Sequence, residues 1–188
     1  MTDPTIITAI EHPELFRRWF RDPVTWATWF AFLRSVFGLP MSESELQVLR
    51  ACTGLADPPE GGVQEAWLIC GRRSGKSIVL ALIAVFLATF RDWRPYLAPG
   101  ERGTVMVVAT DRRQARVIYR YAHALLSQVP ALAAMIERET MRIDCLHCIR
   151  FGLFVAPRLS AMARPPSNAN HGCAEVYRDS AGLASAAG

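Results

Sequence analysis

The segment that most constrains the fold is a glycine-containing loop between two apolar runs. Residues 70–77 read CGRRSGKS, with EAWLIC at 65–70 before them and IVLALIAVFLATF at 78–90 after them. The first run is short enough for a buried strand, and the second is apolar on every side, as in a buried helix. A membrane span needs about 20 residues, so we expect 78–90 to be a core helix. Strand, loop and helix in this order predict an α/β fold.

The loop has the residue types of a phosphate-binding loop. It ends in Gly75, Lys76 and Ser77, and Cys70 stands where the usual pattern has its first glycine. In such loops backbone N–H groups surround the phosphates, the lysine reaches the β and γ phosphates, and the hydroxyl ligates Mg²⁺. Lys76 is the only lysine among 21 Lys and Arg residues. A compact ammonium suits this position in a phosphate-binding loop, whereas the planar guanidinium of an arginine would fit poorly.

These features predict that the chain binds ATP and Mg²⁺, with Ser77 as the Mg²⁺ ligand. The alternative is a glycine turn with a surface lysine, which leaves the two apolar flanks unexplained. The predicted nucleotide-binding residues are Gly71, Arg72, Arg73, Ser74, Gly75, Lys76 and Ser77.

Composition places the chain in a broad class. Its 188 residues leave room for one domain, and 51% apolar with 20% charged residues is typical of a soluble globular protein. The net charge of +4 permits contact with nucleic acid, but the arginines are spread along the chain rather than gathered in one block. Acidic residues stand where a secretory signal would be basic, so we expect a cytoplasmic protein.

The five cysteines are too few for a disulfide scaffold, so we expect reduced thiols. Cys145 and Cys148, followed by His171 and Cys173, raise the alternative of a zinc site. The second pair has the wrong internal spacing for a zinc ribbon or finger, which favours a strand and turn at the first pair instead.

Before the loop, residues 14–37 carry Trp and Phe at helical spacing and predict one or two amphipathic helices, broken near Asp22 and Pro23. We interpret this aromatic stripe as core, although such a segment can also wall an adenine ring. Ser42 and Glu45 form the pattern of a capping box, so a short helix is expected to run to about Cys52 and stop at Gly54. Residues 57–62 (DPPEGG) are expected to be a loop.

After the core helix, residues 91–102 read as an exposed connection and 104–109 as a second parallel strand. Asp111 can cap the next helix, which should end before Pro130. Strand and helix alternate, which predicts a parallel sheet with flanking helices and the loop at its carboxyl edge. A short helix near 131–138 and one or two β segments between 141 and 155 complete the ordered part of the chain.

The expected organisation is an N-terminal helical segment (1–62), a partial ATPase core (63–151) and an irregular tail (152–188). The apolar face of the helix after 111 comprises Ala115, Val117, Ile118, Tyr121, Ala122, Leu125 and Leu126.

The Trp-rich helices, the block at 66–77 and the segment VVATDRRQAR at 107–116 together resemble the ATPase domain of phage terminase large subunits, the motors that package viral DNA. The resemblance covers about residues 17–144, and that family often lacks the first loop glycine and carries an arginine inside the loop. It implies a P-loop NTPase-like parallel sheet, with Lys76 and Ser77 at the phosphates and Mg²⁺ and with Arg72 as a transition-state arginine near the γ-phosphate. The partners that it implies are viral DNA, a portal and a small terminase subunit, in a possible ring homo-oligomer inside a bacterial host. It implies no membrane.

The sequence also departs from this family. A packaging ATPase needs an apolar strand ending in Asp-Glu, and no Asp-Glu pair occurs anywhere in this chain. There is no length for the nuclease domain with its two metal ions, and from about residue 152 the composition turns to Ala, Arg, Pro, Ser and Gly. We therefore expect a truncated ATPase with weak or no hydrolysis, and our hypothesis for the truncation is a frameshift near that point.

Several alternatives stay open at the level of sequence. The chain could be a stand-alone P-loop NTPase or kinase, with Asp144 or Asp179 as the metal-supporting acid, or a non-enzymatic remnant or interaction module. Adenine contacts could come from Gln47, Gln64 or a tryptophan. Arg112, Arg113 and Arg116 fit a solvated helix face better than a DNA-binding track.

Overall fold

The computed structural model describes residues 4–109, 112–139, 143–145 and 149–155. They form two compact units. The first unit contains the described parts of residues 1–21 and 75–167, and the second contains residues 22–74. The segment expected as one N-terminal helical part, residues 1–62, therefore contributes to both units. Each unit has its own buried core and is described by itself.

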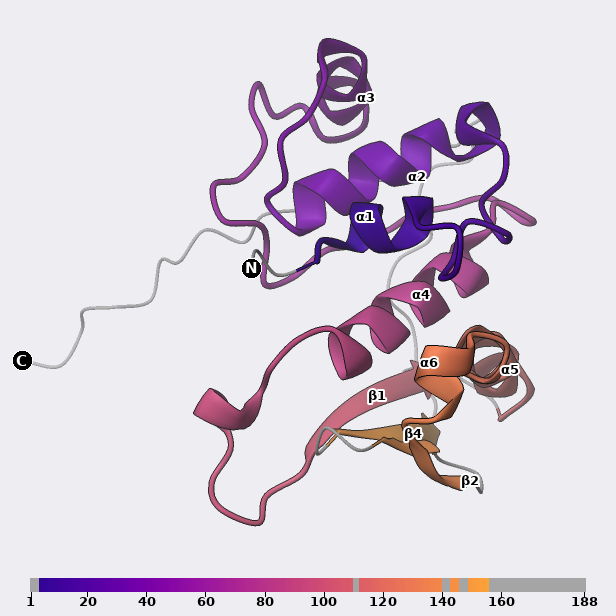
Figure 1. The fold of residues 1–188 in the computed structure, drawn as a ribbon. Helices are drawn as coiled ribbons and strands as arrows, with labels where there is room; N and C mark the ends of the chain where they lie inside the picture. The colour runs from indigo at the N-terminus through magenta and orange to yellow at the C-terminus, as the bar shows by residue number, and fades with distance from the viewer. Residues whose placement is uncertain (1–3, 110–111, 140–142, 146–148, 156–188) are drawn as a thin grey trace, which may run out of the picture. The chain divides into compact units, whose positions relative to one another are not determined.

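The first unit is built around α4 (Lys76–Thr89). Val79, Leu82, Val85 and Phe86 of this helix are fully buried, which confirms the prediction of a core helix. α4 packs on α5 (Arg112–Ser127), and both helices contact β1 (Gly103–Ala109) and β4 (Ile149–Val155) (Figure 1). Apolar side chains on both facing helix surfaces make this packing favourable. Ala115, Ala122, Leu125 and Leu126 of α5 are buried, whereas Tyr121 is 42% exposed, so the predicted apolar face is buried in part.

A four-stranded sheet lies in the same unit, in the order β1-β4-β3-β2. β1 pairs parallel with β4, while β3 (Ile143–Cys145) and β2 (Ile136–Glu139) continue antiparallel. The strands predicted at 104–109 and between 141 and 155 are therefore present. The expected parallel sheet is represented by one parallel pair, and assignment to the P-loop class stays a prediction.

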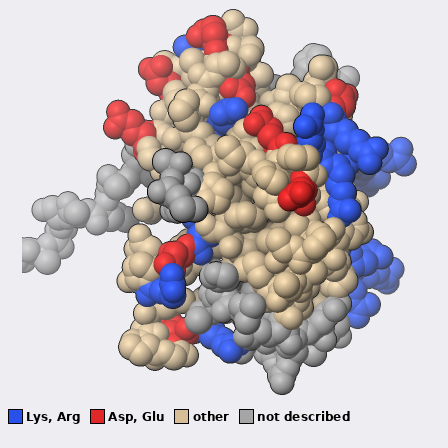
Figure 2. Space-filling model, viewed as in Figure 1, with Lys and Arg blue, Asp and Glu red and all other residues tan. Residues whose placement is uncertain are grey.

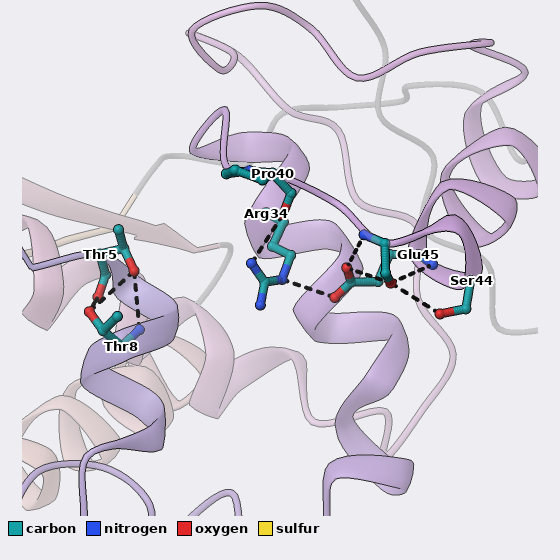
Figure 3. A network of polar contacts seen from close by, with 7 residues as sticks. Thr5, Thr8, Arg34, Pro40, Ser44 and Glu45 are labelled. Atoms are coloured by element: carbon teal, nitrogen blue, oxygen red, sulfur yellow. Dashed lines mark hydrogen bonds and ion pairs between the residues drawn. The ribbon is translucent and has the colours of Figure 1, made fainter.

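The chain's first residues also belong to this unit. Thr5 caps the start of α1 (Ile6–Glu11): its hydroxyl accepts a hydrogen bond from the amide of Thr8 at 3.1 Å (Figure 3). After α1, the ring of Phe16 is fully buried and meets the ring of Phe90 edge-on at 6.2 Å. Arg18 donates to the carbonyl of Gln128 at 2.5 Å. The N-terminal turns are thereby attached to the ends of α4 and α5.

The second unit contains α2 (Pro23–Val36) and α3 (Glu43–Thr53), which pack on each other. Asp22 caps α2 and Pro23 occupies its first turn, which confirms the predicted break. Ser42 and Glu45 form the capping box of α3, and Gly54 ends it with a φ of 71°, as predicted. Residues 57–62 are a loop, also as predicted.

An ion pair joins the two helices of this unit (Figure 3). Nε of Arg34 lies 3.0 Å from Oε1 of Glu45, without the alignment of a hydrogen bond. Nη1 of Arg34 also donates to the carbonyl of Pro40 at 3.1 Å. Both side chains of the ion pair are mostly shielded from water, so the pair holds α2 and α3 to each other more firmly than an exposed pair would.

Three sequence predictions are wrong in their local structure. Residues 65–70 form no strand, because no described strand hydrogen-bonds to them and strands need a partner. Residues 14–21 form successive turns rather than helix, because Phe16 and Phe20 turn into the core and the amides of Trp19 and Phe20 bond three residues back. The helix expected at 131–138 is only α6 (Pro130–Ala133), because the chain enters β2 at Ile136 to pair with β3. The predicted cap Asp111 lies outside the described residues.

A mostly exposed connection runs from Arg91 to Arg102, as predicted, with Arg91, Trp93 and Leu97 half-buried, and it includes one 3₁₀ turn, η1 (Arg94–Tyr96). The indole N–H of Trp93 donates to the carbonyl of Leu87 at 2.6 Å. This bond satisfies a carbonyl in the last turn of α4, where helix carbonyls lack partners within the helix.

Removing the capping hydroxyl of α3 tests the energetics of the second unit. We expect Ser42→Ala to lower the free energy of unfolding by about 1 kcal/mol, because the amide of Glu45 loses its acceptor. Ser44→Ala is the matched control: it removes an exposed hydroxyl that lies 3.1 Å from Oγ of Ser42 but keeps the acceptor of the Glu45 amide, so the expected change is below about 0.5 kcal/mol. Urea denaturation measures both. Equal losses in the two variants would contradict the capping role.

The cap of α2 gives a pH dependence. The hydroxyl of Thr25 and the amide of Val24 donate to the carboxylate of Asp22 and lower its pKa below the ordinary value. A lowered pKa in the folded state stabilises the fold above the unfolded pKa, and this stabilisation is lost as the pH falls through the folded pKa. We expect the stability difference between the natural chain and Asp22→Asn to be constant near neutral pH and to shrink below about pH 4. Chemical denaturation across that range measures it, and a difference that widens in acid would refute the prediction.

Candidate nucleotide-binding site

The loop at 70–77 has an unusual backbone. Arg73 has a φ of 61° and is the only non-glycine residue with positive φ in the described part of the chain. Gly75 has a φ of 86° and precedes the first residue of α4, Lys76. The left-handed region is unfavourable for side chains other than glycine, so the conformation at Arg73 has to be held by its surroundings. The two compact units meet in the sequence between Ser74 and Gly75, and each half of the loop is described within its own unit.

The first half of the loop lies against α2. The indole N–H of Trp29 donates to the carbonyl of Ser74 at 2.7 Å, and the Trp29 side chain is 8% exposed. A hollow of about 170 Å³ opens beside this contact. Seven residues line it: Thr25, Thr28, Trp29 and Phe32 from α2, and Cys70, Gly71 and Ser74 from the loop. The aromatic stripe is thus buried in part, at Trp29, Phe32 and Leu33, and two of these residues, Trp29 and Phe32, also form one wall of a hollow at the loop.

The second half of the loop is the start of α4. Gly75 supplies no side-chain cap, and its carbonyl accepts the amides of Ile78 and Val79 at 3.1 and 3.2 Å. Lys76 is exposed and Ser77 is half-buried. An uncapped helix N-terminus has a partial positive charge and N–H groups directed along its axis, which favours a bound anion.

Basic side chains add to this charge. Arg72 and Arg73 are exposed, so three cationic residues lie within five positions of the chain. Figure 2 shows other basic side chains gathered over α5 and over the turns after α1. Arg113 and Arg116 are exposed on α5, as the interpretation of a solvated helix face requires, while the side chain of Arg112 lies outside the described ones.

No described carboxylate completes a metal site. Asp144 lies in β3, an antiparallel strand, and stands in register with Arg138 and Arg150. In P-loop proteins the metal-supporting acid ends a parallel strand at the carboxyl edge of the sheet, so this position argues against Asp144. Among the described residues there is no group of three His, Cys, Asp or Glu side chains that could hold a metal ion. Asp179, Cys148, His171 and Cys173 lie outside those residues.

Sequence reasoning missed three residues of the hollow, Thr25, Thr28 and Phe32. Their spacing along α2, with Trp29, places them on one helix face and could have indicated them. The two glutamines considered for adenine contact do not line the hollow, and both are exposed. Of the alternatives, a tryptophan is the residue at the loop.

The residues present fit a polyphosphate better than they fit a metal ion alone. The loop offers an ammonium, two guanidinium groups, two hydroxyls and an uncapped helix start, which are donors for phosphate oxygens. Ser77 is the one hydroxyl at the expected Mg²⁺ position, and a single hydroxyl binds Mg²⁺ only together with phosphate oxygens and water. The arrangement is suited to binding and charge neutralisation.

The two glycines of the loop make a matched pair for substitution. Gly75 has positive φ, whereas an added Cβ at Gly71 meets nothing within 4 Å and its φ is not in the left-handed region. We expect Gly75→Ala to lower the free energy of unfolding by about 1–2 kcal/mol and Gly71→Ala to change it by less than about 0.5 kcal/mol. Thermal or urea denaturation of the two variants measures this. Equal stability would mean that the loop does not hold a left-handed residue at position 75.

None of the described helices has the length and apolarity needed to cross a lipid bilayer. Comparison of the chain with protein families, with curated proteins and with solved structures finds no match in any of the three.

Proposed function

We propose that this chain binds ATP together with Mg²⁺ through the loop at 70–77 and belongs to a terminase-type DNA-packaging ATPase. The observation that carries the proposal is the loop itself: Gly75 in the left-handed region leads directly into the buried helix α4, with Lys76 and Ser77 as its first residues. This order of residues and conformations is the one by which phosphate loops present N–H groups and an ammonium to an anion.

Each residue has a role in the proposed site. Lys76 pairs with the β and γ phosphates, and Ser77 contributes its hydroxyl to Mg²⁺. Arg72, which is exposed and belongs to the same loop, neutralises charge that develops on the γ-phosphate, as a transition-state arginine does. Arg73, Ser74, Gly71 and Gly75 contribute backbone N–H groups.

The hollow beside α2 accommodates the base. Its volume of about 170 Å³ is below the 300–1,000 Å³ of pockets that enclose a whole ligand, so it suits one part of a nucleotide. Two aromatic rings, Trp29 and Phe32, and two threonine residues line it, which matches a flat ring with polar edges.

Hydrolysis is proposed to be weak or absent. Activation of the attacking water requires a carboxylate near the γ-phosphate, and the sequence contains no Asp-Glu pair at the end of an apolar strand. Phosphate positioning without this base gives binding with little turnover. The chain thus corresponds to the part of a packaging ATPase that carries the phosphate loop, and DNA, a portal and a small subunit are partners of that proposed assembly.

Nucleotide binding by the purified chain tests the proposal. We expect a fluorescent ATP analogue to bind in the presence of Mg²⁺, and Lys76→Ala to weaken binding by at least about tenfold, because a charged hydrogen bond to phosphate is lost. Arg17→Ala is the matched control: Arg17 is exposed and outside the loop, so this variant removes one positive charge with an expected change below about twofold.

Equal weakening in both variants would show a general charge effect and refute the loop as the site. Phosphate release, measured in the same samples, tests the second part of the proposal. Turnover that depends on Lys76 at the rate of an intact motor would refute weak hydrolysis.

A further inference from the structure

One hydrogen bond connects the loop to a helix far away in the sequence. The indole N–H of Trp29 and the carbonyl of Ser74 are separated by 45 positions in the chain and by 2.7 Å in space. The Trp29 side chain is 8% exposed, so water has little access to the N–H. A buried donor without a partner is unfavourable, and the Ser74 carbonyl is therefore held in one direction.

That direction also fixes the next amide. A trans peptide unit is planar, with its C=O and N–H pointing to opposite sides, and the described chain contains no cis peptide bond. When Trp29 holds the oxygen of Ser74, the N–H of Gly75 must point away from the indole. The negative end of the carbonyl is turned toward the helix, and the positive end of the same peptide unit is turned away from it.

The peptide unit needs an external partner. It joins Ser74 to Gly75, and both Gly75 and the residue before Ser74, Arg73, have left-handed backbones; Arg73 has a side chain that disfavours this region. A free glycine-rich segment of this kind samples several conformations, and rotation of the peptide unit would aim the carbonyl at an anion instead of the N–H.

Trp29 is itself held firmly. It lies on the buried face of α2, and its ring meets the ring of Phe32 edge-on at 5.7 Å. A donor on a packed helix is more precise than one on a mobile surface side chain.

We infer that Trp29 is a positioning residue of the phosphate loop: its indole N–H holds the Ser74 carbonyl and so directs the Gly75 N–H toward the phosphates. This inference rests on the proposed nucleotide binding. It goes beyond that function because it assigns a specific task to a residue of α2 that touches no phosphate.

The test compares two tryptophans that make the same kind of bond. Trp29→Phe removes the bond to Ser74, and Trp93→Phe removes the bond from Trp93 to the carbonyl of Leu87 at the far end of α4. A third protein carries benzothienylalanine at position 29, which keeps the shape of the indole and replaces its N–H by sulfur. Two properties are measured for each: the affinity for Mg²⁺ and ATP, and the rate of tryptic cleavage at Arg72, Arg73 and Lys76 without nucleotide, relative to cleavage at the exposed Arg17.

We expect both changes at position 29 to speed loop cleavage about fivefold and to weaken ATP binding about fivefold to tenfold, while Trp93→Phe changes each by less than twofold. Cleavage at the natural rate in the benzothienylalanine protein would overturn the inference, as would equal effects of Trp29→Phe and Trp93→Phe. If the natural chain binds no nucleotide, the proposed function fails. Loop cleavage then still decides whether Trp29 holds the loop.

Discussion

Burial of α4 is the constraint on which the first unit depends. The helix contacts α5, β1 and β4, and four of its side chains are fully buried: Val79, Leu82, Val85 and Phe86. Each large side chain buried in this way contributes about 1.5–3 kcal/mol. Because α4 is held on several sides, its first turn is fixed too, and with it the position of Lys76. A helix that moved freely could not present its N-terminus to a ligand in a defined direction.

The second unit contributes in a different way. Its core is smaller, and specific polar contacts set its geometry: the caps of α2 and α3 and the ion pair between Arg34 and Glu45. These contacts orient α2 so that Trp29 and Phe32 face the loop. The same aromatic residues therefore serve the core and the wall of the hollow. An aromatic residue of α2 can therefore pack in the core and still line the proposed base-binding hollow.

The charge of the loop, which contains no carboxylate, supports the proposed function. Arginines, a lysine and an uncapped helix start attract and neutralise an anion, which is the larger part of what phosphoryl transfer requires. Activation of water is a separate requirement and needs a base. Asp144, one of the two aspartates considered as the metal-supporting acid, lies in an antiparallel strand opposite two arginine positions. Binding and turnover are thus separate requirements, and the proposed function assigns to this chain the residues for the first.

The sequence alone determined the features that depend on neighbouring residues: the break at Asp22 and Pro23, the capping box at Ser42 and Glu45, and the apolar helix after Lys76. Such signals lie within one helical turn and act before distant segments meet. Only the tertiary structure decided that 65–70 joins no strand of the described sheet, that β4 lies between β1 and β3, and that Trp29 bonds to Ser74. Strand pairing and a bond across 45 positions depend on which segments come together, and local propensity contains no information about that.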